Sequence, residues 1–370
     1  MDDTHNDSGL PLPDLYIENF RGIKKLSIPR LGRVNLLAGR NGVGKSTVLD
    51  AVRVYAARGR EQVLAQILNR SEEYIELRDQ DATNAVEVDW TAIFYGRGVP
   101  ELLYMSIGPM EKTDQLKIES TLYDLGSIDR DQLPTAFSAV VTGDRLQTLM
   151  AEFQGHSFSL VSGDRGTKGY TGEKVPTPLT FEFLGPGLLP QSEMARMWDD
   201  VALTDDEERI TKAIKLVYGE GVDRLAVVGG YSRGDLSAGR RVIVKLKSGT
   251  GPVPLRSLGE GASRLFGVAL ALANSLNGFL LIDEAENGIH HTAQPEYWRM
   301  VLQTAHENNV QVFATTHSWD CVRGFAQAAV ENENVEGVLV RLEKEEDGLR
   351  AVRYSERRLK IAAEQRIEVR

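Results

Sequence analysis

The stretch GRNGVGKST, residues 39–47, decides the fold class of this chain. It matches the pattern G-x-x-x-x-G-K-[ST], with an apolar stretch, VNLLAG (34–39), before it and a helical stretch after it from about Ser46 to Ala57. In this context the glycines let backbone N–H groups face a phosphate, and the N-terminus of the following helix favours the anion. The segment therefore predicts a nucleotide-binding P-loop.

The loop also predicts a role for its individual side chains. We expect Lys45 to bridge the β- and γ-phosphates of ATP, and Ser46 to ligate Mg²⁺. The residues expected to surround the nucleotide phosphates are Arg40, Asn41, Gly42, Val43, Gly44, Lys45, Ser46 and Thr47.

A second stretch, LLIDEAENGIHH (280–291), admits three interpretations: the end of a membrane segment, a metal site, or the floor of a nucleotide pocket. Residues 265–282 carry no charge, but their length is at the lower limit for a membrane span. Asn274, Ser275 and the turn-forming pair Asn277–Gly278 interrupt them. This pattern favours a core helix over 262–276, a turn, and a short buried strand over 279–283.

The acidic residues at the end of that strand complete the nucleotide site. Asp283 stands where a P-loop hydrolase needs a carboxylate for the Mg²⁺ shell, and Glu284 is placed to polarise the attacking water as a general base. A solvated strand end is the alternative. His290 and His291 are neighbours, whose side chains diverge on a helix or strand, so a zinc pair is not favoured.

The stretch QVFATTHSWD (311–320) repeats the pattern of an apolar strand followed by polar residues. In a parallel sheet, ligands bind at the carboxyl ends of the strands. His317 is therefore a candidate contact of the γ-phosphate or the catalytic water, with a capping or core histidine as the alternative.

Strands and helices alternate in the last third of the chain, which predicts a parallel, buried sheet. Residues 14–29 are expected to form two short strands, and residues 60–80 a polar helix. Further expectations are strands within 85–96, 115–125, 179–185, 225–230 and 240–247, an exposed loop over 163–174, a helix over 203–219 with a capping box from Thr204 to Glu207, helices 293–308 and 318–330, strand 310–316, and a closing Asp-Gly hairpin with a short helix after it.

Composition is that of an ordinary globular protein, with 42% hydrophobic and 26% charged residues and a net charge of −10. Binding to nucleic acid would therefore need a local basic face. The single cysteine, Cys321, fits a reducing compartment, and the acidic N-terminus lacks the pattern of a secretory signal. We expect a cytoplasmic location and no membrane association.

Several of these segments together resemble one family. FRGIKK (20–25), SLGEGASRLFGVALAL (257–272), LLIDEAENGIHH, VQVFATTHSWDCVRGF (310–325) and the closing hairpin are similar to the small AAA-family ATPases related to OLD and RecF proteins, which carry ABC-type ATPase heads. The resemblance implies an α/β, ABC-type P-loop head with a mixed or parallel central sheet. It implies a discontinuous core over 14–97 and 222–370, with an inserted α+β segment of unassigned role over 98–221. The acidic, polar composition of the N-terminus predicts a disordered lead-in over 1–13.

The resemblance also implies a head-to-tail dimer that encloses two ATP molecules. SLGEG (257–261) stands where such heads carry LSGGQ, so Gly259 and Gly261 are expected to contact the nucleotide of the other subunit, with Arg264 as the usual downstream arginine. Leu258 replaces the signature serine. Ser257 or Ser263 could substitute for it, the glycine N–H groups could suffice, or the segment could be an ordinary helix cap. A coupling glutamine is unassigned, with Gln62 and Gln66 as candidates.

The resemblance leaves the biological role open between two main hypotheses. Without a Toprim nuclease domain or coiled-coil arms, the chain resembles a stand-alone ATPase subunit that controls a separately encoded effector, a Toprim-type nuclease or a toxin, in phage defence. The alternative is a RecF-like DNA-binding ATPase in repair or recombination, which needs a basic groove. A transporter ATPase is less favoured. The basic candidates for a DNA groove are Arg21, Lys24, Lys25, Arg30, Arg33, Arg233, Arg240, Arg241, Lys245 and Lys247.

Overall fold

The computed structural model describes residues 9–78, 84–97, 102–124, 139–142, 145–160, 176–219, 221–229, 239–249, 251–332, 334–345 and 348–354. The expected loop over 163–174, the expected helix after the closing hairpin, and Arg233 lie outside these residues.

A six-stranded sheet forms the centre of the molecule, in the order β11-β15-β16-β3-β17-β18. All neighbours pair in parallel except β18, which closes an antiparallel hairpin with β17. Every residue of β3, β15 and β16 is buried, as parallel strands covered on both faces require. The strands are β11 (Phe181–Leu184), β15 (Phe279–Ile282), β16 (Gln311–Thr316), β3 (Val34–Ala38), β17 (Gly337–Glu345) and β18 (Gly348–Tyr354).

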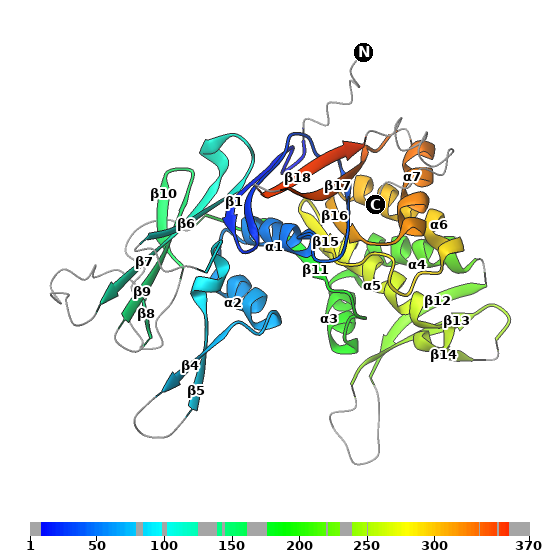
Figure 1. Ribbon diagram of the computed structural model, residues 1–370. Coiled ribbons are helices and arrows are strands. Elements are labelled where there is room, and N and C mark those ends of the chain that lie inside the picture. Colours follow the sequence, from blue (N-terminus) through cyan, green and yellow to red (C-terminus); the bar gives the residue numbers. More distant parts are fainter. Residues whose placement is uncertain are drawn as a thin grey trace.

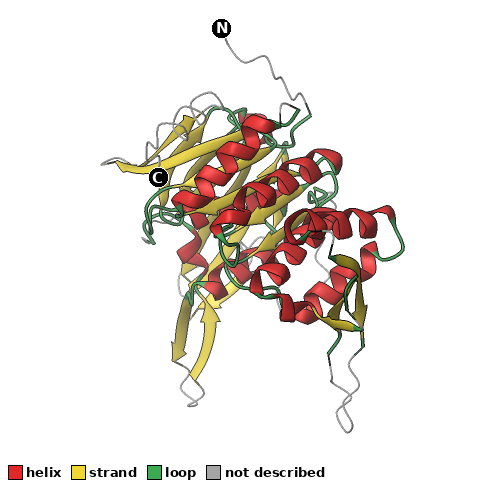
Figure 2. Ribbon diagram, turned by 90° about the vertical axis from the view of Figure 1, so that its right-hand side faces the viewer, coloured by secondary structure: helices red, strands yellow, loops and turns green. Residues whose placement is uncertain are grey.

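Helices cover one face of this sheet (Figure 2). Their apolar sides pack on alternate residues of the strands, among them Leu36, Ile282 and Ala314, in one continuous hydrophobic core. The helices of this layer are α3 (Gln191–Val201), α4 (Asp205–Tyr218), α5 (Glu260–Asn274), α6 (Gln294–Glu307) and α7 (Trp319–Glu331).

The opposite face of the sheet packs on α1 (Lys45–Ala56) and on a second, antiparallel sheet (Figure 1). The other set of alternate residues, among them Leu37, Leu281 and Phe313, belongs to this second core. The antiparallel sheet has the order β10-β9-β7-β6-β1-β2, with β8 paired to β9. Its strands are β1 (Leu15–Phe20), β2 (Ile23–Ile28), β6 (Leu102–Gly108), β7 (Leu116–Asp124), β8 (Ala139–Thr142), β9 (Arg145–Phe153) and β10 (His156–Ser159).

Smaller elements lie around these layers. The remaining helix is α2 (Glu61–Arg70), and two further sheets pair β4 with β5 and β12, β13 and β14 in order. Their strands are β4 (Tyr74–Arg78), β5 (Asn84–Val88), β12 (Val222–Val228), β13 (Arg241–Leu246) and β14 (Pro252–Pro254), and the short 3-10 helices are η1 (Trp90–Ile93), η2 (Lys112–Asp114), η4 (Leu255–Leu258) and η5 (His291–Ala293).

The expected helix over 60–80 is wrong in its second half. Helix α2 ends at Arg70, and β4 begins at Tyr74 after a turn in which Glu72 has a positive φ of 55°. The capping box of α4 is also different from the expectation: the Thr204 hydroxyl accepts from the Asp206 N–H, and Glu207 accepts from the Leu203 N–H.

Two observations bear on the expected domain boundaries. Leu12, placed in the lead-in, is fully buried, and its backbone exchanges two hydrogen bonds with the Gln311 amide. Strand β11, placed in the insertion, is the edge strand of the central sheet, because its apolar residues pair with β15 and cover the end of α1. Strand β6 likewise extends the sheet of β1. The central sheet and the antiparallel sheet therefore each combine strands from the expected core with strands from the expected insertion.

The uncharged run 265–282 is divided between α5 and β15, as its Asn-Gly pair predicted, and both elements are buried. Among the helices of the described residues, none has both the length and the apolar character needed to cross a membrane.

Gly278 lets β11 dock against β15. A Cβ at this position would lie 2.0 Å from the Thr180 carbonyl oxygen, a backbone atom that accepts from the Phe279 N–H.

We predict that Gly278→Ala lowers the free energy of unfolding by about 1–3 kcal/mol, since the backbone must shift to admit the methyl group. Denaturant unfolding measures this, with Gly22→Ala as the control because its Cβ would meet nothing within 4 Å. Equal stability of the two variants would contradict the tight docking.

Candidate nucleotide-binding and hydrolysis site

The P-loop joins β3 to α1, as the motif predicted. Gly39, Gly42 and Gly44 have φ angles of 147°, 72° and 111°, a region that glycine adopts without a steric penalty. A Cβ on Gly39 would also lie 2.8 Å from the Leu342 carbonyl oxygen. Gly44 caps α1 without a side-chain hydrogen bond, so N–H groups of the first turn stay available to an anion.

Lys45 is folded back onto its own loop. Its Nζ donates to the carbonyl oxygens of Gly39, at 2.8 Å, and Arg40, at 3.1 Å. Burial lowers the pKa of Lys45, and the nearby carboxylates of Glu286, Asp283 and Glu284 oppose this shift. The lysine is therefore a largely desolvated cation surrounded by acidic groups, at the edge of an anion-binding loop.

Asp283 ends β15 with a side chain that is 5% exposed. Its Oδ1 accepts hydrogen bonds from the Ser46 hydroxyl at 3.0 Å and from the Thr315 hydroxyl at 2.7 Å. A carboxylate and two hydroxyls at the rim of a phosphate loop are the oxygen ligands that Mg²⁺ prefers, alongside phosphate and water. The side chains present thus fit a magnesium ion.

Glu284 follows in a strained backbone conformation, with a φ of 51°. Its N–H donates to the Thr315 hydroxyl at 2.8 Å, and its Oε2 accepts from the Asn287 amide at 2.7 Å. The carboxylate is partly exposed and held at one oxygen. This leaves its other oxygen able to accept a proton from water.

His317 begins the loop after β16, and its side chain is 45% exposed. Both its backbone N–H and its ring Nδ1 contact Glu286 Oε1, at 2.9 and 3.0 Å. The structure therefore brings His317 to the loop that carries Asp283 and Glu284, as expected from the positions of the two strands.

Arg264 connects α5 to the strand ends. Its guanidinium donates to the carbonyl oxygens of Gly185, Gly187 and Asp283 at 2.7–3.0 Å. Burial lowers the pKa of Arg264. These three hydrogen bonds fix the helix that begins at the signature segment to the loop of the acidic residues.

The signature segment is open to solvent. Gly259 caps α5 with a φ of 100°, is exposed, and has open space at its Cβ position. Leu258 packs on the helical core, while Ser257 is exposed. Ser263 is only 2% exposed, with a buried hydroxyl, so Ser257 and the N–H groups of the first turn are the groups that face outward.

The structure brings the expected P-loop residues, Asp283, Glu284 and His317 to one edge of the sheet, and leaves Gly259 and Gly261 apart. Among the described residues, no hydrogen bond or ion pair joins residues 257–261 to residues 39–47. Gln66 accepts from Arg53 between α1 and α2, away from the acidic loop, and Gln62 is exposed.

Sequence reasoning missed three residues of the site: Thr315, Glu286 and Asn287. Thr315 carried a usable signal, since it is a hydroxyl near the carboxyl end of a buried strand beside Asp283. The side chains of His290 and His291 do not diverge as expected: their ring centroids lie 4.1 Å apart with the rings tilted by 40°, and both residues are exposed. The described residues contain no group of three or more acidic, histidine or cysteine side chains arranged for a metal.

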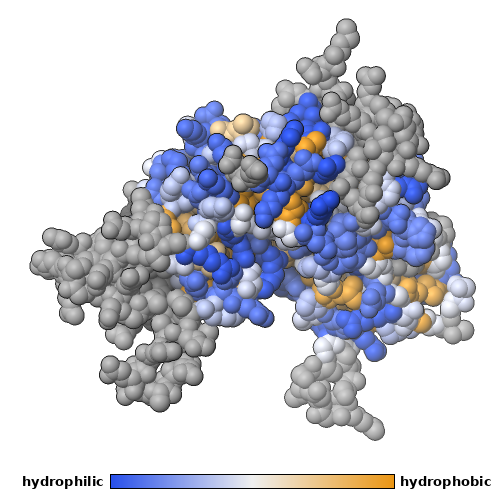
Figure 3. Space-filling model, viewed as in Figure 1, coloured by the Kyte–Doolittle hydropathy of each residue, from blue (hydrophilic) through white to orange (hydrophobic). Residues whose placement is uncertain are grey.

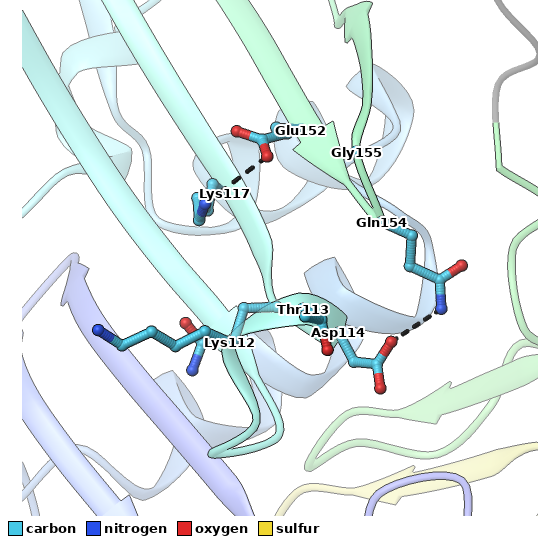
Figure 4. A pocket seen from close by; sticks show the side chains of 8 residues that line it. Lys112, Thr113, Asp114, Lys117, Glu152, Gln154 and Gly155 are labelled. Atoms are coloured by element: carbon cyan, nitrogen blue, oxygen red, sulfur yellow. Dashed lines mark hydrogen bonds and ion pairs between the residues drawn. The ribbon is translucent and has the colours of Figure 1, made fainter.

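A separate hollow of about 520 Å³ lies against β7 and β9, and shares none of these residues (Figure 4). Within it, Lys117 forms an ion pair with Glu152, and the Gln154 amide donates a hydrogen bond to Asp114. On the face seen in Figure 3, the described surface is mainly hydrophilic, with small separate apolar areas.

Comparison with known proteins agrees with the class of site. A family model for an AAA domain matches residues 14–104, and a model described as "AAA domain, putative AbiEii toxin, Type IV TA system" matches residues 206–320. An ATP/GTP phosphatase of Helicobacter pylori is 21% identical over 345 residues, which cover 87% of this chain and 89% of that protein. The chain also aligns with the SmcHead in its crystal structure with the C-winged helix domain of ScpA. The alignment covers 93% of this chain and 97% of that chain, with a TM-score of 0.50 and 12% identity, and it shows a similar fold.

The chain is a P-loop ATPase with the ABC-type head fold. It belongs to the family of the uncharacterized protein MJECL11 of Methanocaldococcus jannaschii, with 36% identity over 93 residues, which are 25% of this chain and 80% of that protein.

Thr315 offers a direct test of the site's geometry. We predict that Thr315→Val lowers kcat for ATP about tenfold, because the variant removes the hydroxyl that positions both Asp283 and the Glu284 N–H, and an unmade buried hydrogen bond costs about 1–3 kcal/mol. Steady-state ATPase assays measure this, with Thr211→Val on α4 as the control. An unchanged kcat would show that the hydroxyl does not order the site.

Proposed function

We propose that two copies of this chain associate head-to-tail over two ATP·Mg²⁺, and that the ATP-bound pair is a slowly hydrolysing switch for a separately encoded effector, a nuclease or a toxin, in defence against phage. The observation that carries the dimer is the open signature segment. Gly259 at the start of α5 and Gly42 in the P-loop are both exposed, and each has open space at its Cβ position.

The two open half-sites on one chain both favour phosphate. The P-loop binds the phosphates, while the uncapped N-terminus of α5 offers N–H groups that favour an anion. Because no hydrogen bond or ion pair joins the two segments among the described residues, the α5 terminus of one subunit is free to close on the nucleotide held by another. This supports a site completed by two subunits.

The mechanism follows from the side chains at the strand ends. Lys45 exchanges its carbonyl contacts for phosphate oxygens, and Ser46, Asp283 and Thr315 are the groups that would hold the magnesium ion. Bound Mg²⁺ neutralises phosphate charge. Glu284 orients the attacking water and takes its proton, while Asn287 holds the carboxylate in place. His317 contacts the γ-phosphate.

The proposed role in defence is supported by the family description that matches residues 206–320, which names a putative toxin of a toxin–antitoxin system, and by the resemblance of the motifs to OLD-related ATPases. Within the head, Arg264 connects the nucleotide state to the signature helix, because it joins this helix to the acidic loop.

The DNA-binding alternative has less support from the charges. Several basic residues that would form its groove are engaged with acidic ones: Arg30 and Glu336 form an ion pair at 3.0 Å, and Lys245 and Asp223 form one at 3.3 Å. Arg240 is paired with Asp199, and both are exposed. Such pairing lowers the positive potential available to a phosphate backbone.

Two substitutions separate binding from hydrolysis. We predict that Lys45→Ala abolishes ATP binding, and that Glu284→Gln retains binding, lowers kcat at least about 100-fold, and accumulates an ATP-dependent dimer. Nucleotide binding, ATPase rate and mass by light scattering measure these outcomes. Hydrolysis by Glu284→Gln at the wild-type rate would disprove the general-base assignment, and a monomer at saturating ATP would disprove the sandwich.

The partner is identified with the same trapped variant. We expect tagged Glu284→Gln protein, recovered from its native cells with ATP present, to retain a nuclease or toxin in stoichiometric amount, and Lys45→Ala to lose it. Recovery of DNA alone, removable by nuclease or by salt, would instead favour the repair function.

A further inference from the structure

Glu286 lies three residues beyond Asp283, in the loop after β15, and reaches across to the loop after β16. Its side chain is 10% exposed. One oxygen, Oε1, receives both contacts of His317: the backbone N–H at 2.9 Å and the ring Nδ1 at 3.0 Å.

These two contacts fix both the backbone and the side chain of His317. The backbone contact fixes where His317 leaves the strand, and the ring contact fixes the rotation of the imidazole about its side-chain bonds. An acceptor at Nδ1 keeps a proton on that nitrogen, and the second nitrogen of the ring, Nε2, then points away from the acceptor. The single oxygen Oε1 of Glu286 thus sets the position of His317, the orientation of its ring and the nitrogen that carries the proton.

The other surroundings of Glu286 belong to the phosphate site. Among the carboxylates that act on Lys45, Glu286 has the largest electrostatic effect. Its Oε2 is buried and accepts no hydrogen bond from the described residues, as is true of the nearby Tyr297 hydroxyl. A carboxylate serving only as a structural link would sit more favourably with both oxygens paired.

We propose that Glu286 is a positioning residue for hydrolysis: its Oε1 holds His317 by ring and backbone so that Nε2 faces the γ-phosphate of bound ATP. This inference rests on the proposed role of His317. It assigns to Glu286 a function separate from that of Glu284, which is held by Asn287 and by Thr315.

A double-mutant cycle tests the assignment. The variants are Glu286→Ala, His317→Ala and their combination, measured for kcat, KM and equilibrium ATP binding. Glu286→Ala is expected to lower kcat about tenfold or more with KM changed less than about threefold, by analogy with the loss found when the orienting partner of a metal-bound histidine is removed. In the combined variant the loss equals that of His317→Ala alone, because Glu286 acts through His317.

A conservative variant distinguishes positioning from general destabilisation. Glu286→Gln keeps an amide oxygen that accepts both N–H groups, so its kcat should stay within about threefold of the wild type. Glu296→Ala, at a partly exposed α6 position paired with Arg299, is the control and should behave as wild type. Where the alanine variant loses cooperative melting, Glu286→Met, which fills a similar volume without an acceptor, replaces it in the cycle.

The outcomes separate this inference from the function on which it rests. If His317→Ala hydrolyses ATP at the wild-type rate, the role proposed for His317 fails. If His317→Ala is slow while Glu286→Ala is normal, or if the two losses multiply in the combined variant, only the positioning role of Glu286 is overturned. A Glu286→Gln variant as slow as Glu286→Ala would also overturn it.

Discussion

One carboxylate oxygen, Oδ1 of Asp283, accepts hydrogen bonds from two hydroxyls that lie far apart in the sequence. Ser46 belongs to α1, and Thr315 belongs to β16. The three side chains therefore join the P-loop helix to two strands of the central sheet at a single buried point. The Thr315 hydroxyl also accepts from the Glu284 N–H, so the same point fixes the residue placed to activate water.

This arrangement is possible because of strand order. β3, β16 and β15 are adjacent and parallel, so their carboxyl ends lie side by side, and each contributes polar residues where its apolar run ends. The P-loop follows β3, the acidic loop follows β15, and His317 follows β16. With β16 between the other two, Thr315 and His317 can bond to the acidic loop on one side while the P-loop lies on the other.

Sequence alone predicted those parts of the site that depend on local patterns. The P-loop glycines, Lys45 and Asp283 are recognisable because their spacing and flanking apolar runs are contained within a few residues. β11 was assigned to an insertion because four residues that pair with a strand about one hundred positions later carry no local signal of that pairing. Glu286 was likewise missed, since its importance depends on a contact with His317, 31 residues away. The turn at residues 71–73 ended the expected helix because Glu72 adopts a left-handed conformation that the polar composition does not reveal.

Helix α1 connects the nucleotide site to the antiparallel sheet. Lys45 and Ser46 occupy its first turn, and Arg58, just beyond its last turn, stacks on Tyr55 at 4.5 Å and on Phe153 of β9 at 4.0 Å. This helix is about 18 Å long, and its apolar side is embedded in a closely packed core. It therefore links the P-loop at its first turn to the Arg58 stack beyond its last turn. In the helical layer, Arg264 of α5 joins the signature helix to the acidic loop. The loops of the nucleotide site are therefore joined to both layers of the head, a connection that the proposed ATP-driven switch requires.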